Sequence, residues 1–206
     1  MVSVPSRVEI VCFDDADPPG NAVAWLPGEA PMTGIEVVDA DAAWPQRFVE
    51  LADRIRAALG AAALRVEHVG STSVPGLSAK PIIDVDLELA DTADEHSYIP
   101  ALELAGFRLV VREPWWYGHR CLRADAEPRA NLHVFPFDCA EPARHRIFRD
   151  WLRTNHADRE LYATTKRQAA TEANAAGEHV MGYNARKQAV IREIYDRAFR
   201  AAGLLD

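Results

Sequence analysis

The sequence predicts an α+β fold, in which a mixed sheet with flanking helices is followed by a C-terminal helical lobe. Short β-branched runs bounded by glycine and proline fill the middle of the chain. Helical periodicity dominates after residue 141. The 206 residues, 49% of them apolar, suit one compact core with ordinary globular composition.

Residues 1–34 are expected to form an irregular extension, because turn residues such as Pro27, Gly28 and Pro31 interrupt them. Within this extension, the apolar run at 8–11 suggests one short strand, and the similar run at 35–38 echoes it. We interpret the segment as an extension of the core and not as a domain.

Residues 35–140 are predicted to form the α/β core. Trp44 and Pro45 open its first helix, with Asp41 or a neighbour as the cap and Gly60 as the stop. A second helix is expected at 98–105. The expected strands cover 64–69, 81–89, 107–112, 120–123 and 131–137.

Residues 141–206 are predicted to form the helical lobe, packed on the core. Its helices are expected at 142–154, 158–175 and 183–201, with Gly177 and Gly182 between the last two. The histidines at 145, 156 and 179 lack partners at metal-ligand spacing, so they are interpreted as surface residues.

The charge balance limits the partners that we expect. Asp and Glu number 31 against 23 Lys and Arg, a formal charge of −8, which disfavours binding to long nucleic acids. No apolar run approaches the roughly 18 residues of a membrane span, and the N-terminus does not resemble a secretion signal. Three scattered cysteines fit reduced thiols. We therefore expect a cytoplasmic protein without a membrane partner, and the oligomeric state stays open.

The segment 68–87 carries the strongest chemical signal. Gly70 and Ser71 end a strand and begin a loop of small hydroxyl residues, whose backbone N–H groups and hydroxyls suit phosphate oxygens. Asp84 and Asp86 alternate on the next strand, so both side chains project from one face and suit a divalent cation such as Mg²⁺. Glu88 continues that face.

This Gly-Ser pair, followed after twelve residues by Asp-x-Asp, resembles the signature of the DNA polymerase β-like nucleotidyltransferase superfamily. The closer resemblance is to the GrpB family, whose hallmark resembles EHVGSTSVPGL at 67–77 and AKPIIDVD at 79–86. The likeness runs from about residue 35 to 187 and excludes 1–34.

The resemblance implies roles for individual residues. Gly70 and Ser71, with Ser73, would bind the triphosphate, and Asp84 and Asp86 would hold Mg²⁺. Active members of the superfamily use a third carboxylate on a neighbouring strand. At the matching place this chain has His133, which is therefore expected to be a metal ligand or a catalytic base.

Further basic and aromatic residues complete the expected site. Lys80, just before the Asp-x-Asp strand, and Lys187, on the last helix, are expected to neutralise phosphate charge. A segment rich in arginine and tryptophan suits the recognition of a nucleobase or an acidic small molecule. Its predicted substrate-binding residues are Arg112, Trp116, His119 and Arg120.

The sequence therefore predicts Mg²⁺-dependent transfer of a nucleoside monophosphate from a nucleoside triphosphate (NTP), with ATP as the default, to a small-molecule acceptor. If the acceptor is a carboxylate, the adenylate could serve as the intermediate of a ligation. The alternative is a non-catalytic module that binds a nucleotide or a metabolite, because the third carboxylate is missing. RNA binding through the arginine and tryptophan segment is a third hypothesis, which the acidic charge disfavours.

Overall fold

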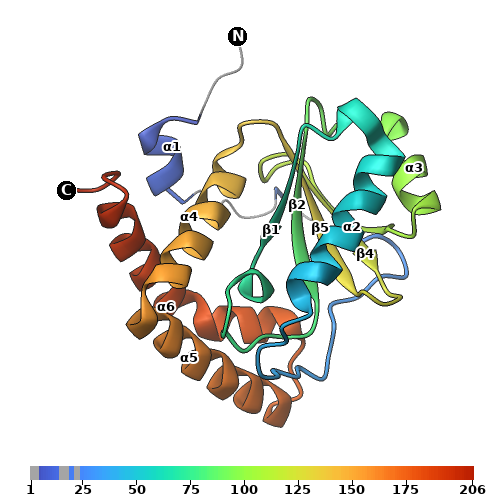
Figure 1. The fold of residues 1–206 in the computed structure, drawn as a ribbon. Coiled ribbons are helices and arrows are strands. Elements are labelled where there is room, and N and C mark those ends of the chain that lie inside the picture. The colour runs from blue at the N-terminus through green and yellow to red at the C-terminus, as the bar shows by residue number, and fades with distance from the viewer. Residues whose placement is uncertain (1–4, 14–18, 21–23) are drawn as a thin grey trace.

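A five-stranded mixed sheet forms the centre of the computed structural model, which describes residues 5–13, 19–20 and 24–206. The strand order is β1-β2-β5-β4-β3, and only β2 and β5 run parallel (Figure 1). The mixed sheet predicted from the sequence is thus confirmed. The strands are β1 (Arg65–Val69), β2 (Ile83–Leu89), β3 (Arg108–Glu113), β4 (His119–Ala124) and β5 (Ala130–Pro136).

Two helices cover one face of the sheet. They are α2 (Trp44–Leu59), which begins at the expected Trp44-Pro45 pair, and α3 (Ile99–Leu104). Both lie on the right of the sheet in Figure 1. The main core lies between these helices and the sheet, because alternate strand residues point toward them. It includes Leu51, Ile55, Val85, Leu102 and Leu132.

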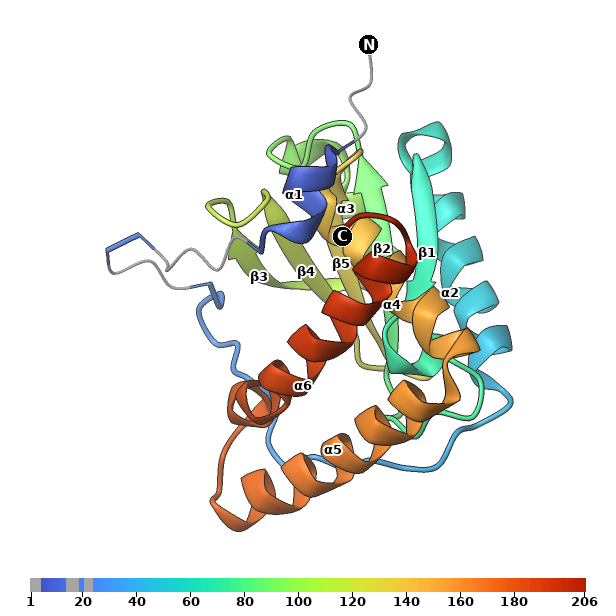
Figure 2. The same cartoon turned by 90° about the vertical axis from the view of Figure 1, so that its left-hand side faces the viewer.

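Three consecutive helices follow the last strand, as the sequence predicts. They are α4 (Ala140–Thr154), α5 (His156–Ala175) and α6 (Val180–Ala201). In Figure 1, α4 lies on the side of the sheet opposite α2, and Figure 2 shows α5 running below the sheet. A second apolar cluster, which includes Val74, Leu77, Leu152, Tyr162 and Ile194, joins these helices to the loop after β1. This face holds the candidate site.

The prediction of a strand at 8–11 was wrong, because this run is the helix α1 (Arg7–Val11). Ser6 caps the helix by accepting a hydrogen bond from the Glu9 backbone, and the Glu9 carboxylate accepts one in return from the Ser6 backbone. The similar run at 35–38 forms only an isolated bridge between Val38 and Ala79. Part of the extension expected at 1–34 lies outside the described residues.

Two predicted helix ends also differ. The last helix begins at Val180, so Gly182 lies inside α6 and does not separate it from α5. Ala43 and not Asp41 occupies the N-cap of α2, although the Asp41 carboxylate accepts a hydrogen bond of 2.8 Å from the Ala43 backbone. Within the described ranges, no helix is both long and apolar enough to cross a bilayer.

Candidate functional site

The register of the sheet brings the predicted acidic and histidine residues together. Asp86 on β2 pairs directly with His133 on β5, and Asp84 pairs with Asn131. Because side chains alternate along a strand, these four side chains project from the same face. Beyond His133, the row continues to Cys121 on β4. The strand pairing therefore builds the site from residues that are far apart in the sequence.

A cavity of about 800 Å³ lies over this face. This volume is in the range of cavities that hold a small ligand, roughly 300–1,000 Å³. Eight of the residues predicted for the site line it, namely Gly70, Ser71, Lys80, Asp84, Trp116, His119, His133 and Lys187. Asp86 lies below them, with only 1% of its surface exposed.

The turn after β1 requires glycine at position 70. Gly70 has φ 66° and ψ −170°, a conformation that is essentially restricted to glycine. A Cβ at this position would also lie 2.9 Å from the Cβ of Asp84. The Ser73 hydroxyl donates a 2.6 Å hydrogen bond to the Gly70 carbonyl, so Ser73 holds the turn and does not line the cavity.

The two aspartates differ in their surroundings. Asp84 is partly exposed and accepts a 2.9 Å hydrogen bond from the Asn131 side chain. One oxygen of Asp86, Oδ2, lies 2.8 Å from Nδ1 of His145, while the buried Oδ1 has no hydrogen-bond partner among the described residues. Asp86 therefore keeps one oxygen available for a further ligand.

The interpretation of His145 as a surface residue was wrong, because His145 is the partner of this aspartate. Burial lowers the pKa of His145, but the nearby Asp86 and Glu141 carboxylates outweigh it and raise the pKa well above the usual value. The charged imidazolium of His145 thus compensates the buried carboxylate of Asp86. The interaction joins α4 to β2, which are separate in the sequence.

A chain of polar contacts orients His133. The Glu113 carboxylate lies 2.7 Å from Nδ1 of His119, and Nε2 of His119 lies 3.1 Å from Nδ1 of His133. From this network we assign a proton to Nδ1 of each histidine. Nδ1–H of His133 then donates to Nε2 of His119, and Nδ1–H of His119 donates to the Glu113 carboxylate. The lone pair of His133 then lies on Nε2, which is 4.0 Å from the Asp84 carboxylate. Burial, with the neighbouring His119, lowers the pKa of His133 to about 4.

The residues of this site suit a Mg²⁺ ion that binds together with phosphate better than they suit a metal ion held by protein ligands alone. Among the residues that the structure describes, no group of three His, Cys, Asp or Glu is arranged to hold a metal. Mg²⁺ is commonly held by one or two carboxylates, with water and substrate phosphates completing its shell. Asp84, which lines the cavity, and Asp86, whose buried Oδ1 has no hydrogen-bond partner among the described residues, are the two carboxylates that would hold Mg²⁺.

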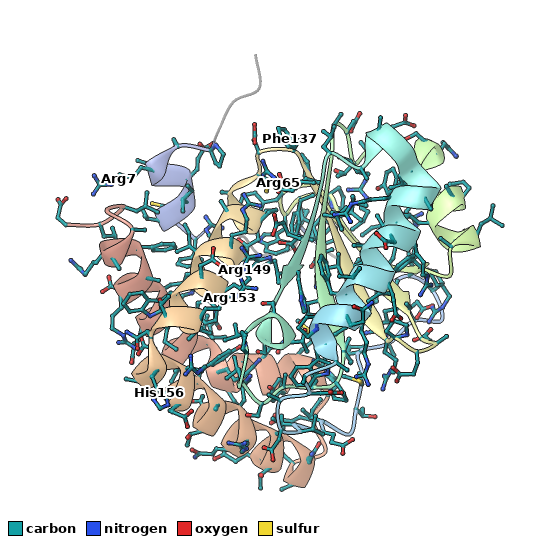
Figure 3. The ribbon with its side chains drawn as sticks, viewed as in Figure 1. Arg7, Arg65, Phe137, Arg149, Arg153 and His156 are labelled. Carbon is teal, nitrogen blue, oxygen red and sulfur yellow. The ribbon has the colours of Figure 1, made fainter. Side chains whose placement is uncertain are left out.

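Glu88 does not supply a third carboxylate to the cavity. Arg146 lies 2.7 Å and Arg65 3.0 Å from its Oε1, so two guanidinium groups already pair with this buried side chain. Figure 3 shows Arg65 beside Phe137, whose ring centroid lies 4.9 Å from the Arg65 guanidinium carbon.

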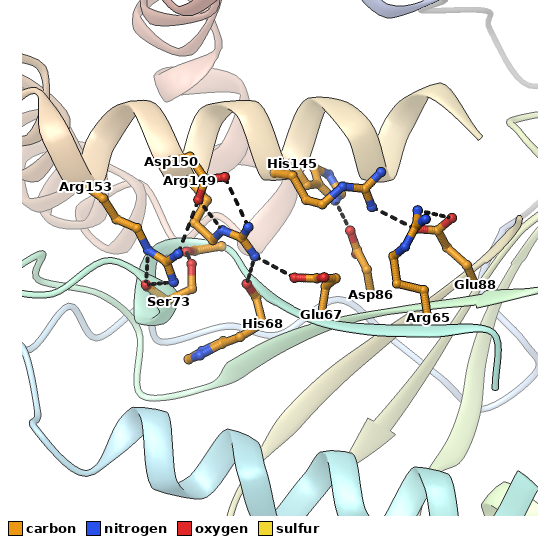
Figure 4. A network of polar contacts seen from close by, with 12 residues as sticks. Arg65, Glu67, His68, Ser73, Asp86, Glu88, His145, Arg149, Asp150 and Arg153 are labelled. Carbon is orange, nitrogen blue, oxygen red and sulfur yellow. Dashed lines mark hydrogen bonds and ion pairs between the residues drawn. The ribbon is translucent and has the colours of Figure 1, made fainter. Parts of the chain in front are cut away.

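Several polar side chains of α4 attach this helix to β1, β2 and the following loop. In Figure 3, Arg149 and Arg153 lie on the side of α4 that faces β1. Figure 4 shows three of these contacts: Arg149 with Glu67 and the His68 carbonyl, Arg153 with the Ser73 carbonyl, and His145 with Asp86. Arg146 also donates a hydrogen bond to Glu88. The loop that contains Gly70 and Ser71 is thus fixed from both ends.

The chain has only three lysines, Lys80, Lys166 and Lys187, and all three line this cavity. Lys166 and Lys187 are 2% and 8% exposed. Burial, together with the other lysines, lowers the pKa of Lys166 to about 6 and that of Lys187 to about 7. No ion pair of these lysines is seen in the described part of the chain, although the charge of Asp84 acts to raise the pKa of all three. Burial disfavours the charged form of these amines and a nearby anion would favour it, so the cluster suits an anionic ligand.

The sequence analysis did not identify Lys166. It lies on α5, where it contacts the ring of Tyr162 and donates a hydrogen bond to the Ser78 carbonyl. A signal was present, because Lys166 falls on the buried stripe of α5 with Tyr162, Ala163, Ala169, Ala170 and Ala173. A lysine on an apolar stripe, in a chain with few lysines, indicates a special role.

Arg112 and Arg120, both expected to bind substrate, do not line the cavity. They pair directly across β3 and β4, and strand alternation places them away from Val111 and Cys121, which do line it. Both guanidinium groups instead bind Glu95, at 2.7 and 2.8 Å. Trp116 and His119 do reach the cavity. The arginines on its wall are Arg123 and Arg129.

Comparison with known proteins relates this fold to others. The family model described as "GrpB protein" matches residues 34–197. The "UPF0157 protein BH1888" of Halalkalibacterium halodurans is 46% identical over 164 residues, which cover 80% of this chain and 82% of that protein. The crystal structure of the conserved protein GrpB from Enterococcus faecalis superposes with a TM-score of 0.69 at 32% identity, and the match covers 81% of this chain and 99% of that one.

A more distant likeness is to a larger protein. A dephospho-CoA kinase of Mycolicibacterium paratuberculosis is 28% identical over 192 residues. The match covers 80% of this chain but only 46% of the kinase. This chain therefore resembles a part of that protein.

Proposed function

This chain belongs to the GrpB family, and we propose that it binds a nucleoside triphosphate with Mg²⁺ and transfers the nucleoside monophosphate to a small-molecule acceptor. All of its lysines lie at one cavity that acidic and hydroxyl side chains also line. ATP is the expected donor. Where the acceptor is a carboxylate, the acyl adenylate would be the activated product from which a ligation proceeds. The observation that carries the proposal is the group of buried lysines without carboxylate partners.

The lysines supply the positive charge that a triphosphate requires. Lys187 lies over the ring of Tyr183, 4.0 Å from its centroid, and Lys80 lies 5.6 Å from the same centroid. The cluster is therefore compact and held by packing. An incoming polyphosphate would raise the pKa of these amines and restore their full charge, since an opposite charge nearby favours the protonated form. Ser71 and the turn at Gly70 add hydrogen-bond donors.

The aspartates and His133 would act at the reacting phosphate. Asp84 and Asp86 are the residues that would hold Mg²⁺, which would offset charge on the phosphate oxygens during transfer. His133 offers the lone pair of Nε2 toward Asp84. With a pKa of about 4 it is a weak base at neutral pH, so it suits metal ligation better than proton abstraction.

Ligand binding tests this proposal most directly. We expect ATP with Mg²⁺ to raise the melting temperature, because a ligand at 100 times its Kd stabilises a protein by about 2.7 kcal/mol. Asp84→Asn should remove the Mg²⁺-dependent part of the shift, while the exposed-site control Asp53→Asn should keep it. Absence of a shift with every nucleotide would contradict the proposal.

A chemical footprint gives an independent reading. Because the chain has three lysines and all line the cavity, ATP should protect each of them from acylation by an amine-reactive reagent. Mass spectrometry of the modified peptides would measure this. Release of pyrophosphate across a panel of hydroxyl, phosphate and carboxylate acceptors would then test transfer itself.

The second candidate is a non-catalytic module that binds a nucleotide or a metabolite. The β5 position that pairs with Asp86 holds His133 instead of a third carboxylate, which favours this candidate, and Glu88 is paired elsewhere. The likeness to only part of a dephospho-CoA kinase also fits a module that accompanies an enzyme. This candidate predicts ATP binding with the same lysine protection but no release of pyrophosphate with any acceptor.

A further inference from the structure

The segment 24–32 precedes the part of the chain that matches the family model, yet it builds one wall of the cavity. The family match begins at residue 34. The backbone of Ala24 and Leu26 forms hydrogen bonds of 2.8 and 3.0 Å with β3, and the Met32 carbonyl accepts one of 2.8 Å from Val180 on α6. The segment is therefore fixed at both ends, to the edge of the sheet and to the start of a helix.

The pairing with β3 places Trp25 on the face that carries the aspartates. Trp25 forms an antiparallel bridge with Val111, which pairs with Cys121, which pairs with His133. Directly paired residues project to the same side of a sheet. Strands are spaced by about 4.8 Å, so the backbone of Trp25 lies about 14 Å from that of His133 along this row.

The cavity is lined by both polar and apolar side chains. The three lysines, Ser71 and Asp84 are among the polar ones. Trp25 packs against Val110, Val111 and Cys121. The apolar residues that line the cavity with Trp25 include Ala24, Met32, Val111, Val180 and Met181. The guanidinium carbon of Arg123 lies 4.9 Å from the centroid of the Trp25 ring, which holds the ring in place.

We infer that Trp25, with Met32, binds the nucleobase of the triphosphate whose phosphates lie at the lysines. The inference rests on the proposed function and adds to it the site of the base. A nucleobase is planar and apolar on its faces, so an aromatic ring is a suitable partner for every base. Trp25 joins the β3 edge of the sheet, across it from β1 and β2, which lead to Ser71 and Asp84. A nucleotide with its phosphates at Ser71 and Asp84 would extend in this direction to place its base. The segment thus adds a base-binding wall outside the region that the family model matches.

The test separates the base from the phosphates. We would measure the binding of ATP and of inorganic tripolyphosphate, each with Mg²⁺, by titration calorimetry on the full chain. In the native protein ATP should bind more tightly than tripolyphosphate. Trp25→Ala should weaken ATP about tenfold and leave tripolyphosphate unchanged, whereas Trp25→Phe, which keeps an aromatic ring, should recover most of the ATP affinity.

Each other outcome contradicts the inference in its own way. An unchanged ATP affinity in Trp25→Ala, or equal affinities of ATP and tripolyphosphate in the native protein, would show that the base does not use Trp25. If Trp25→Ala weakened the binding of ATP and of tripolyphosphate equally, Trp25 would have a role in folding alone. If tripolyphosphate and ATP both fail to bind the native protein, the proposed function itself is overturned.

Discussion

Nδ1 of His145 lies 2.8 Å from Oδ2 of Asp86, and this contact links α4 to the strand that carries both aspartates of the site. Asp86 is almost fully buried, so its charge needs a partner inside the protein. The ion pair therefore contributes both to the stability of the fold and to the position of Asp86 in the candidate site. An aspartate can be tolerated at this buried position because His145 compensates its charge.

His145→Ala is expected to lower the free energy of unfolding by about 3 kcal/mol, because it leaves a buried carboxylate without its cation. Since the folded protein raises the pKa of His145, the pair contributes fully below the unfolded pKa of about 6.5 and its contribution is lost as the pH rises through the higher folded value. Urea unfolding at several pH values would measure this. The control is His156→Ala, whose side chain is 75% exposed, and an equal loss in both variants would refute the role of the pair.

Lys187→Met is expected to stabilise the ligand-free protein and to abolish its response to polyphosphate. Between the folded pKa of about 7 and the ordinary value of 10.5, the unfolded chain binds more protons at this site than the folded one. The native protein therefore gains stability as the pH rises through this range. The advantage of Lys187→Met should be greatest at or below pH 7 and vanish near pH 10.5.

Thermal unfolding of both proteins across this pH range, with and without tripolyphosphate, would test the prediction. A variant that is less stable than the native protein at pH 7, or one that still responds fully to tripolyphosphate, would contradict it. The second result would also count against the lysine cluster as the phosphate site.

Gly70→Ala is expected to destabilise the protein and to weaken Mg²⁺-dependent ATP binding. The backbone conformation at Gly70 costs other residues about 1–3 kcal/mol. In addition, the new Cβ would displace Asp84. The matched control is Gly76→Ala, where φ is also positive, at 78°, but no atom lies within 4 Å of the added Cβ.

Both glycine variants should lose stability in chemical denaturation, but only Gly70→Ala should lose ATP affinity beyond what its stability explains. Measured at a temperature where both variants are folded, the two ATP affinities should differ. Equal affinities would show that Asp84 tolerates the added methyl group or does not take part in binding.

The Glu113–His119–His133 chain predicts the tautomer of His133. We expect ¹⁵N spectra at neutral pH to show a neutral His133 with its proton on Nδ1, because its pKa is lowered to about 4 and Nε2 of His119 accepts a hydrogen bond from that Nδ1–H. Glu113→Gln should shift the population toward the Nε2 tautomer and weaken Mg²⁺ binding. The control is the exposed His179, whose signals should not change. A His133 signal that is unchanged in Glu113→Gln would exclude the orienting role.

Neighbouring residues in the sequence determined the local conformation of several segments of this protein. The turn at Gly70 and the alternation of Asp84 and Asp86 are properties of a few neighbouring residues, so their conformation could be predicted from the sequence. The helix 44–59 was also predictable, because Pro45 suits the first turn and Gly60 ends it. The run at 8–11 shows the limit of this approach, since a capping box overrode its resemblance to a strand.

Only the tertiary structure decided which distant groups meet. His145, Lys166 and Trp25 reach the cavity or its aspartates from α4, α5 and an edge segment, and no local pattern specifies those contacts. Conversely, Arg112 and Arg120 lie next to site residues in sequence but face Glu95, because strand alternation directs neighbouring side chains to opposite sides of the sheet. Motif spacing in the sequence identified the turn at Gly70 and the two aspartates, whereas long-range packing determined which residues contact them.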